Sequence, residues 1–215
     1  LLQKKLFLMK KNKDIVGFFL ILLHVAGAIG LSTEYSSNIF LSLVPYNLIL
    51  TFLLCFFYVS FKKHYAPIFL IVLIGFFIEV IGVKTGSLFG AYSYGDTLGF
   101  KILEVPFVIG LNWLILCLSI FSLFSVVFKN KFLLLLFSSI SMVLLDFIIE
   151  PVAIEYSFWS WADSSIPIQN YIMWFFISLV MHYILLKYRI NVHYKLGVYV
   201  VLAQLFFFSY LRIFI

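Results

Sequence analysis

The chain has 215 residues, of which 64% are hydrophobic and only 11% are charged, and its mean hydropathy is +1.14. Soluble domains carry about a quarter charged residues, so this composition excludes an ordinary soluble protein. The net charge of +6 would suit nucleic-acid binding, but the positions of the basic residues, given below, argue against that class.

Apolar runs follow one another along the whole chain, each close to the ~20 residues that a helix needs to cross a bilayer. We therefore predict an all-α fold, a polytopic transmembrane helical bundle of about seven spans, forming a single integral-membrane domain over residues 1–215. The predicted spans are 15–29, 39–60, 67–83, 105–128, 132–154, 168–186 and 196–214. Ala26-Gly27-Ala28 in the first run suits either close helix packing or signal-peptide cleavage.

The basic residues lie almost entirely on one side of the predicted membrane. Twelve of the 15 fall at the N-terminus or in every second connection: Lys4, Lys5, Lys10, Lys11, Lys13, Lys62, Lys63, Lys129, Lys131, Lys187, Arg189 and Lys195. Because cytoplasmic loops are enriched in lysine and arginine, we expect a multi-pass protein of the inner (plasma) membrane. Its N-terminus is predicted to be cytoplasmic and its C-terminus outside, with no nucleic acid among its partners.

Three carboxylates occur inside predicted spans. At 1.5 Å per residue, Glu79 lies roughly 18 Å along the third span, and Asp146 and Glu150 lie roughly 21 and 27 Å along the fifth. Both spans run outward, so we predict that the three side chains cluster near the outer face. Ionisable groups inside a membrane mark functional sites by default.

Acid–base chemistry is one reading of this cluster. Burial and like charge both favour the protonated form of a carboxyl group, so one member could donate a proton while another stays ionised as a base. In the alternative reading, the carboxylates pair with Lys84 or Lys101, or cap helix ends, purely for structure.

Aromatic residues flank the carboxylates at a spacing of two: Tyr92 with Tyr94, and Trp159 with Trp161. They suit an interfacial aromatic belt equally well as a surface that faces an extended apolar ligand or stabilises a cation. We expect Asn112 and Asn170 to bridge helices by hydrogen bonds and His24 and His182 to serve packing. Cys55 and Cys117 are expected to be buried small hydrophobes, and no metal site is predicted.

Two ordered blocks of residues resemble the bacterial and archaeal carotenoid biosynthesis membrane family. The first block is Glu79-Val-Ile-Gly-Val-Lys-Thr-Gly86, followed by Phe89-Gly90-x-Tyr92-x-Tyr94 and Val105-Pro106. The second is Asp146-x-x-x-Glu150-Pro151-Val152-Ala153, then Trp159-x-Trp161, Ile166-Pro167-x-x-Asn170 and Trp174; Pro45-x-Asn47 also fits. The resemblance covers nearly the whole chain. Leu88 departs from it, since a proline often precedes Phe-Gly in that family, and so does Glu150, where many members have Asp.

The resemblance implies carotenoid biosynthesis, with an activity of the carotenoid 1,2-hydratase type, a hydro-lyase that works without a cofactor. Such an enzyme adds water to the terminal C1,2 double bond of an acyclic or monocyclic carotenoid, such as lycopene or γ-carotene. Its partners would be that isoprenoid, membrane lipid and other carotenoid-pathway enzymes. The implied catalytic residues are Glu79, Asp146 and Glu150, and the implied substrate-binding residues are Lys84, Phe89, Tyr92, Tyr94, Trp113, Trp159, Trp161 and Asn170.

Two alternatives stay open at this point. A lycopene-type cyclase begins with the same protonation of an end group but closes a ring instead of adding water. A non-catalytic carotenoid-binding or transport protein would not need the carboxylates at all.

Overall fold

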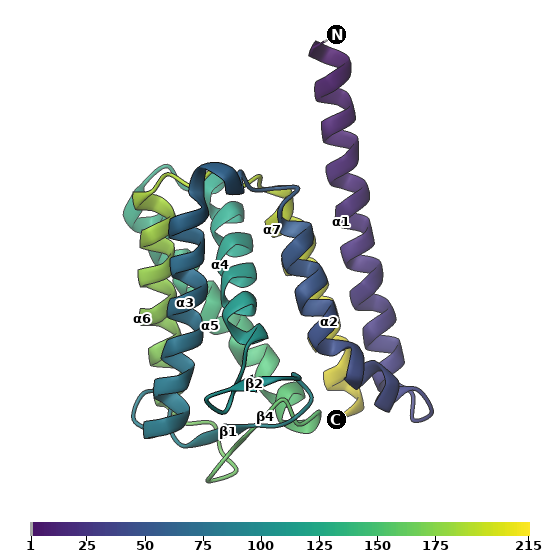
Figure 1. Cartoon of the computed structure of the whole chain (residues 1–215), viewed down its shortest axis with the longest axis vertical. Coiled ribbons are helices and arrows are strands. Elements are labelled where there is room, and N and C mark those ends of the chain that lie inside the picture. Colours follow the sequence, from purple (N-terminus) through teal and green to yellow (C-terminus); the bar gives the residue numbers. More distant parts are fainter. Residues whose placement is uncertain (1) are drawn as a thin grey trace.

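The computed structural model describes the backbone of residues 2–215 and the side chains of residues 12–61 and 64–215. Long helices make up most of the chain (Figure 1). They are α1 (Leu2–Ser32), α2 (Ser37–Cys55), α3 (Phe61–Thr85), α4 (Val108–Val127), α5 (Lys131–Glu155), α6 (Ile168–Lys187) and α7 (Lys195–Leu211), followed by the short 3-10 helix η1 (Arg212–Phe214). In the described part of the chain, all seven are long and apolar enough to cross a membrane, which confirms the predicted number of spans.

Short strands form where the connections at one end of the bundle come together. β1 (Tyr92–Tyr94) pairs with β4 (Trp159–Trp161), and β2 (Lys101–Ile102) pairs with β3 (Val105–Pro106), both antiparallel. The predicted start of the fourth span at residue 105 is therefore wrong. Val105 and Pro106 complete a hairpin, and the helix begins only at Val108.

The second span also ends earlier than predicted, at Cys55 instead of residue 60. The residues beyond it turn across the end of the bundle, where Val59 forms an isolated β-bridge with Val192 in the α6–α7 connection. This bridge places the α2–α3 and α6–α7 connections at the same end of the molecule, as the alternation of spans requires.

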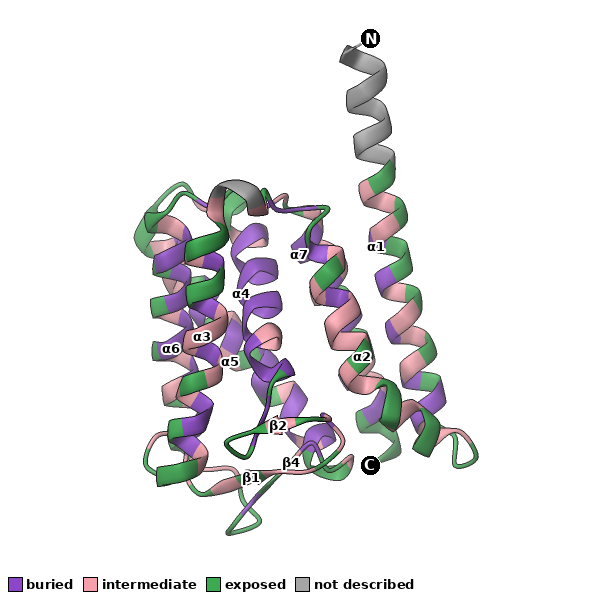
Figure 2. Ribbon diagram, in the orientation of Figure 1, coloured by how far each residue is buried: buried purple, intermediate pink, exposed green. Residues whose placement is uncertain are grey.

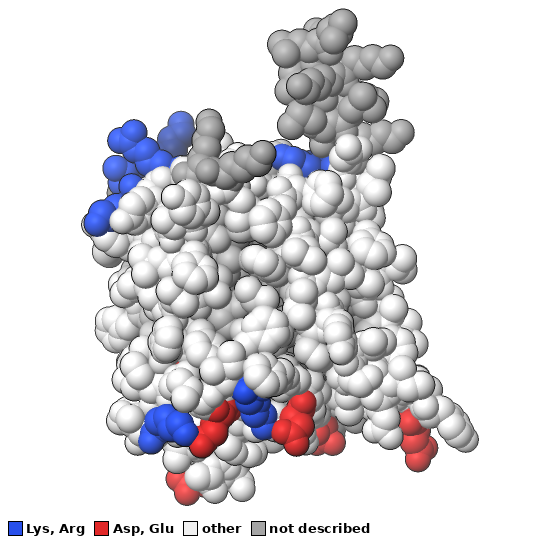
Figure 3. All heavy atoms as spheres, viewed as in Figure 1, with Lys and Arg blue, Asp and Glu red and all other residues white. Residues whose placement is uncertain are grey.

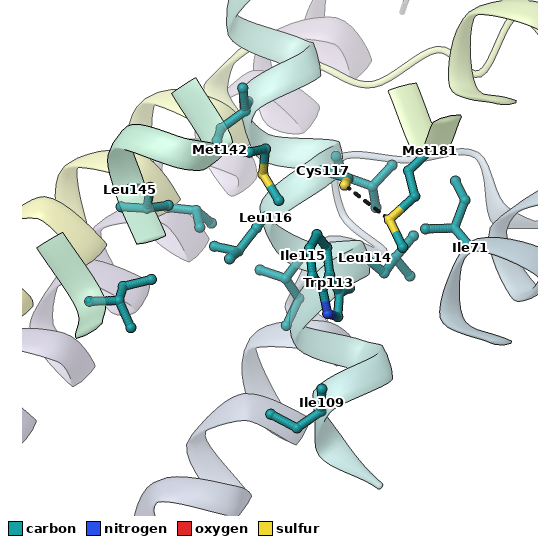
Figure 4. Close-up of a cluster of buried hydrophobic side chains, with 14 of the residues drawn as sticks. Ile71, Ile109, Trp113, Leu114, Ile115, Leu116, Cys117, Met142, Leu145 and Met181 are labelled. Carbon is teal, nitrogen blue, oxygen red and sulfur yellow. Dashed lines mark hydrogen bonds between the residues drawn. The ribbon is translucent and has the colours of Figure 1, made fainter. Parts of the chain in front are cut away.

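Helix α4 lies at the centre of the bundle, with α3, α5 and α6 on one side and α1, α2 and α7 on the other (Figure 1). It is buried along most of its length (Figure 2). Its side chains form the middle of the apolar core, where the thiol of Cys117 lies 3.5 Å from the sulfur of Met181 (Figure 4). Cys55 and Cys117 are both free and buried, as predicted.

Helix α1 packs along α7 through small and polar residues. A Cβ atom at Gly27 would lie 3.3 Å from the ring of Phe207, which agrees with the packing role predicted for the small residues. His24 donates from Nδ1 to the carbonyl of Leu20 at 2.8 Å, and its Nε2 lies 3.3 Å from the amide nitrogen of Gln204. His24 thus has the packing role that the sequence predicted.

The two ends of the bundle differ in charge (Figure 3). The α4–α5 and α6–α7 connections and the helix ends beside them carry Lys129, Lys131, Lys187, Arg189 and Lys195, and at the same end Asp14 pairs with Lys195. The opposite end holds five acidic residues together with Lys84, Lys101 and Arg212. The side chains of Lys4, Lys5, Lys10, Lys11, Lys62 and Lys63, which also entered the orientation argument, lie outside the described residues.

Candidate active site

A small cavity of about 40 Å³ opens between α3, α4, α5 and α6 beneath the β1–β4 pair. It brings together all but one of the predicted site residues: Glu79, Phe89, Tyr92, Tyr94, Trp113, Asp146, Glu150, Trp159, Trp161 and Asn170. The predicted clustering of the three carboxylates, which come from two separate helices, is therefore present in the fold.

The β1–β4 pair forms the roof of this cavity. Tyr92 lies opposite Trp161, Ser93 opposite Ser160, and Tyr94 opposite Trp159. Because side chains alternate between the two faces of a strand, the four aromatic residues share one face. Ser93 and Ser160 share the other face, where their hydroxyl oxygens lie 3.3 Å apart. The spacing of two in the sequence is thus a strand period that turns four aromatic side chains toward the carboxylates.

Glu79, only 5% exposed, accepts three hydrogen bonds. The hydroxyls of Tyr92 and Tyr94 donate to Oε2 at 2.5 and 2.8 Å, and the indole nitrogen of Trp113 donates to Oε1 at 2.8 Å. Burial, and next the charge of Glu79, raise the pKa of each tyrosine far above its usual range, so both hydroxyls keep their protons. Three such donors stabilise the ionised form of a carboxylate.

Glu150 accepts a similar set of hydrogen bonds, two of them from β4, the second strand of the roof. Its Oε2 accepts from the indole nitrogens of Trp159 and Trp161, both at 3.0 Å, and its Oε1 accepts from the amide nitrogen of Asn170 at 3.2 Å. The side chain is 1% exposed. Glu79 and Glu150 therefore each accept three hydrogen bonds from neutral donors.

Asp146 differs from both glutamates. It is fully buried, and its Oδ2 accepts a single hydrogen bond, at 2.7 Å, from the same Asn170 nitrogen that reaches Glu150. Its Oδ1 has no partner among the described residues. Asn170 thus bridges α6 to α5, as predicted, and joins two carboxyl groups one helical turn apart.

Two glycines of α3 allow the close approach that these contacts need. Gly75 and Gly82 lie one turn before and after Glu79 on the same side of α3. A Cβ at Gly75 would lie 2.7 Å from Trp113, and a Cβ at Gly82 would lie 2.6 Å from the ring of Phe89 and 2.8 Å from the hydroxyl of Tyr92. Helix α3 then ends at Thr85, and the left-handed conformation of the next residue, Gly86 (φ of 63°), turns the chain toward β1.

Lys84 is the predicted site residue that the fold does not bring to the cavity. Its ammonium group pairs with Glu104 at 2.6 Å on the surface, while that of Lys101 pairs with Asp96 at 2.7 Å and donates to the carbonyl of Tyr94 at 2.8 Å. The alternative in which these two lysines neutralise the buried carboxylates is therefore wrong.

Comparison with known protein families gives a match over most of the chain. The family described as "Carotenoid biosynthesis protein" matches residues 39–214, a range that includes every residue of the cavity. The chain belongs to the carotenoid biosynthesis protein family. This confirms the resemblance on which the expected function rests.

One relative of this chain is the bisanhydrobacterioruberin hydratase of Haloarcula japonica, which is 30% identical to the chain over 105 residues. The match covers 45% of the chain and 36% of the relative, so it spans about a third of that protein's length. No solved structure gives a significant match.

Four further residues line the carboxylate cavity without having been predicted as site residues: Ile109, Asn112, Ile149 and Trp174. Trp174 stacks on Trp113 with 4.1 Å between ring centroids. Its place in the second motif block was the signal that could have found it. Asn112 was expected to bridge helices, but in the described structure it makes no hydrogen bond to another helix and lines the cavity instead. Within the described residues, no group of three His, Cys, Asp or Glu is placed to hold a metal ion.

Proposed function

We propose that this protein hydrates the terminal C1,2 double bond of an acyclic carotenoid end group by acid–base catalysis. The observation that carries the proposal is the unequal hydrogen bonding of three buried carboxyl groups that share one aromatic cavity. Two of them each accept three donors, and the third has an oxygen without a partner. Membership of the carotenoid biosynthesis family and the partial match to a hydratase support the same conclusion.

Asp146 is the proposed acid. A charged carboxylate that is fully buried with one unpartnered oxygen is costly, whereas a carboxylic acid carries one charge less and can direct its O–H at a ligand. Glu79 and Glu150 have the donors that a carboxylate needs, and Asp146 does not. In the proposed first step, the proton of Asp146 passes to C2, the π electrons of the double bond form the new C–H bond, and a tertiary cation remains at C1.

The cavity walls suit such a cation. Phe89, Tyr92, Tyr94, Trp113, Trp159, Trp161 and Trp174 all line it, and aromatic faces attract a positive charge within about 6 Å of the ring centroid. The ionised carboxylate of Glu79, fixed by its three donors, adds opposite charge on the α3 side. These groups are in place before reaction, so they stabilise the developing charge without reorganising.

Glu150 is the proposed base. A water attacks C1, its oxygen forms the new C–O bond, and its surplus proton passes to Glu150. Because Asn170 holds Glu150 and Asp146 together, a proton can return from Glu150 to Asp146 and restore the starting state. The net reaction is the addition of one water, and no other reactant is consumed.

We place the protein, by the same proposal, in the inner (plasma) membrane as a single domain, with the carboxylate cavity in the outer half. The acidic end of the bundle then faces outward and the basic end faces the cytoplasm, where other carotenoid-pathway enzymes could dock. Membrane lipid surrounds the seven spans.

The test is mass-resolved pigment analysis in a host that makes lycopene or γ-carotene. The wild-type chain is compared with Asp146→Asn, Glu79→Gln and Glu150→Gln, and Glu155→Gln is the matched control because Glu155 lies exposed at the end of α5. We expect the wild type and the control to add the mass of one water, and Asp146→Asn to abolish the product. A product of unchanged mass with a cyclic end would replace the hydratase by a cyclase. Unaltered pigment with the wild type would contradict catalysis on these substrates.

A further inference from the structure

A second and larger cavity adjoins the carboxylate cavity. It has a volume of about 190 Å³ and lies between α1, α2, α4, α5 and α7. Its walls are mainly aliphatic and aromatic side chains, and its few polar residues include His24 and Gln204, which lie against each other. A mainly apolar cavity of this kind favours an apolar occupant over water.

The two cavities meet at a common boundary. Ile109 and Asn112 of α4, Ile149 of α5 and Trp159 of β4 line both of them. The same Trp159 side chain donates to Glu150, so the apolar cavity ends directly beside the proposed base. A ligand that extends through this boundary would have one end among the carboxylates and the rest among apolar side chains.

The larger cavity also reaches the side wall of the bundle, between α1 and α2. Two of its lining residues, Ala26 of α1 and Leu43 of α2, are exposed. Both helices are apolar enough to cross a membrane, so this opening faces lipid and not water. An apolar molecule dissolved in the bilayer could therefore enter sideways without crossing an aqueous phase.

We propose that the α1–α2–α7 cavity holds the polyene chain of the substrate, with the reacting end group in the carboxylate cavity. This rests on the proposed function and adds how the substrate enters and is oriented. The carboxylate cavity has a volume of only about 40 Å³, compared with about 190 Å³ for the larger cavity. A long chain needs the second cavity. The competing occupant is a lipid acyl chain, which would fill the same space without relation to the site.

Two matched pairs of substitutions test the assignment by filling the cavity. Leu23→Trp on α1 and Leu48→Trp on α2 place a large ring in it. Their controls are Leu22→Trp and Leu53→Trp, the same change on the same helices at positions 63% and 51% exposed. Each variant is expressed in a lycopene-producing host and purified in detergent. The absorbance of the bound pigment per protein and the thermal melting of the protein are then measured.

We expect the two cavity variants to retain about tenfold less pigment than the wild type, because the added ring has no space beside the ligand, while both controls retain it. Turnover of lycopene should fall with pigment binding. Turnover of a short acyclic terpene with the same dimethyl-substituted double bond should persist, because that molecule fits without the second cavity.

A milder variant covers the case in which the added ring prevents folding. Leu48→Cys removes bulk, and a thiol reagent should label it more slowly in pigment-loaded protein than in pigment-free protein, whereas Leu53→Cys should label equally in both. Pigment and labelling rates that are the same in cavity and control variants would overturn the assignment and leave the cavity to lipid. Bound pigment of unchanged mass, lost in the cavity variants, would instead contradict hydration and keep the cavity assignment.

Discussion

Tyr92 of β1 lies directly opposite Trp161 of β4, and the two side chains donate to different carboxyl groups, Tyr92 to Glu79 and Trp161 to Glu150. One strand pair outside the helices therefore fixes carboxylates that α3 and α5 carry. The ring centroids of Tyr92 and Trp161 lie 5.2 Å apart, so the roof is packed as well as hydrogen-bonded. Movement of either connection would disturb both halves of the site.

The indole of Trp113 should matter through its N–H group. Trp113→Phe removes the donor to Glu79 Oε1, and we expect a loss of about 1–3 kcal/mol in the free energy of unfolding, the usual cost of leaving a buried acceptor unpaired. Trp174→Phe is the control, because the described structure gives the Trp174 nitrogen no hydrogen bond although its ring stacks on Trp113. Unfolding in detergent, followed for both variants, should show the larger loss for Trp113→Phe. Equal losses would mean that ring size alone matters.

Asn170 should be needed for both stability and turnover. Asn170→Leu leaves Asp146 without its one donor and takes one donor from Glu150, so we expect about 1–3 kcal/mol of destabilisation and little hydrated product. Asn38→Leu, the same change at an exposed position of α2, should change stability by no more than about 0.5 kcal/mol. Melting temperature and product mass, read on the same preparations, check this. Normal product from Asn170→Leu would remove the proposed proton-return step.

Lys84 and Lys101, which lie at the acidic end of the bundle, should behave differently. Lys84 and Glu104 form an exposed pair, and such pairs contribute about 0–1 kcal/mol, so Lys84→Met should leave product formation unchanged. Lys101→Met removes the donor to the carbonyl of Tyr94 and should slow turnover by loosening β1. Initial rates on the same carotenoid compare the two. A larger defect in Lys84→Met would return Lys84 to the substrate-binding residues.

Gly82 should tolerate no side chain. Gly82→Ala places a Cβ 2.6 Å from the ring of Phe89 and 2.8 Å from the hydroxyl of Tyr92, so we expect Tyr92 to leave Glu79 and turnover to fall about tenfold or more. Ile81→Ala, a change at a position of the same helix that is 47% exposed, should keep near-normal rates. Full activity in Gly82→Ala would show that the Tyr92 contact is dispensable.

The sequence predicts the helical part of this fold well because membrane spans need long apolar runs, and the depth of Glu79, Asp146 and Glu150 follows from helical rise alone. It does not predict β1 and β4. Tyr-x-Tyr and Trp-x-Trp are strand-like spacings, but three residues are too few to separate a strand from an aromatic belt. Val105-Pro106 was assigned to a helix for the same reason: apolar character does not distinguish a short strand from the start of a span.

Details of the cavity depend on partners far away in the chain. Nothing near Lys84 in the sequence indicates that it turns to Glu104 and away from the carboxylates. Likewise, the difference between Asp146 and Glu150 arises from Trp159 and Trp161, which donate to Glu150 alone and reach it only when the α5–α6 connection folds back over α5. The sequence therefore locates the acids, and the fold gives them different hydrogen-bond partners.

Isotope labelling of the product is the sharpest test of the proposed hydration. Purified wild-type protein is given an acyclic carotenoid in water enriched in heavy oxygen and, separately, in deuterated water. We expect one heavy oxygen on C1 and one non-exchanging deuterium on C2 for each end that reacts, and no labelled product from Asp146→Asn. A product that carries deuterium but no heavy oxygen would contradict hydration and indicate ring closure, and a pigment without either label would contradict proton-initiated catalysis.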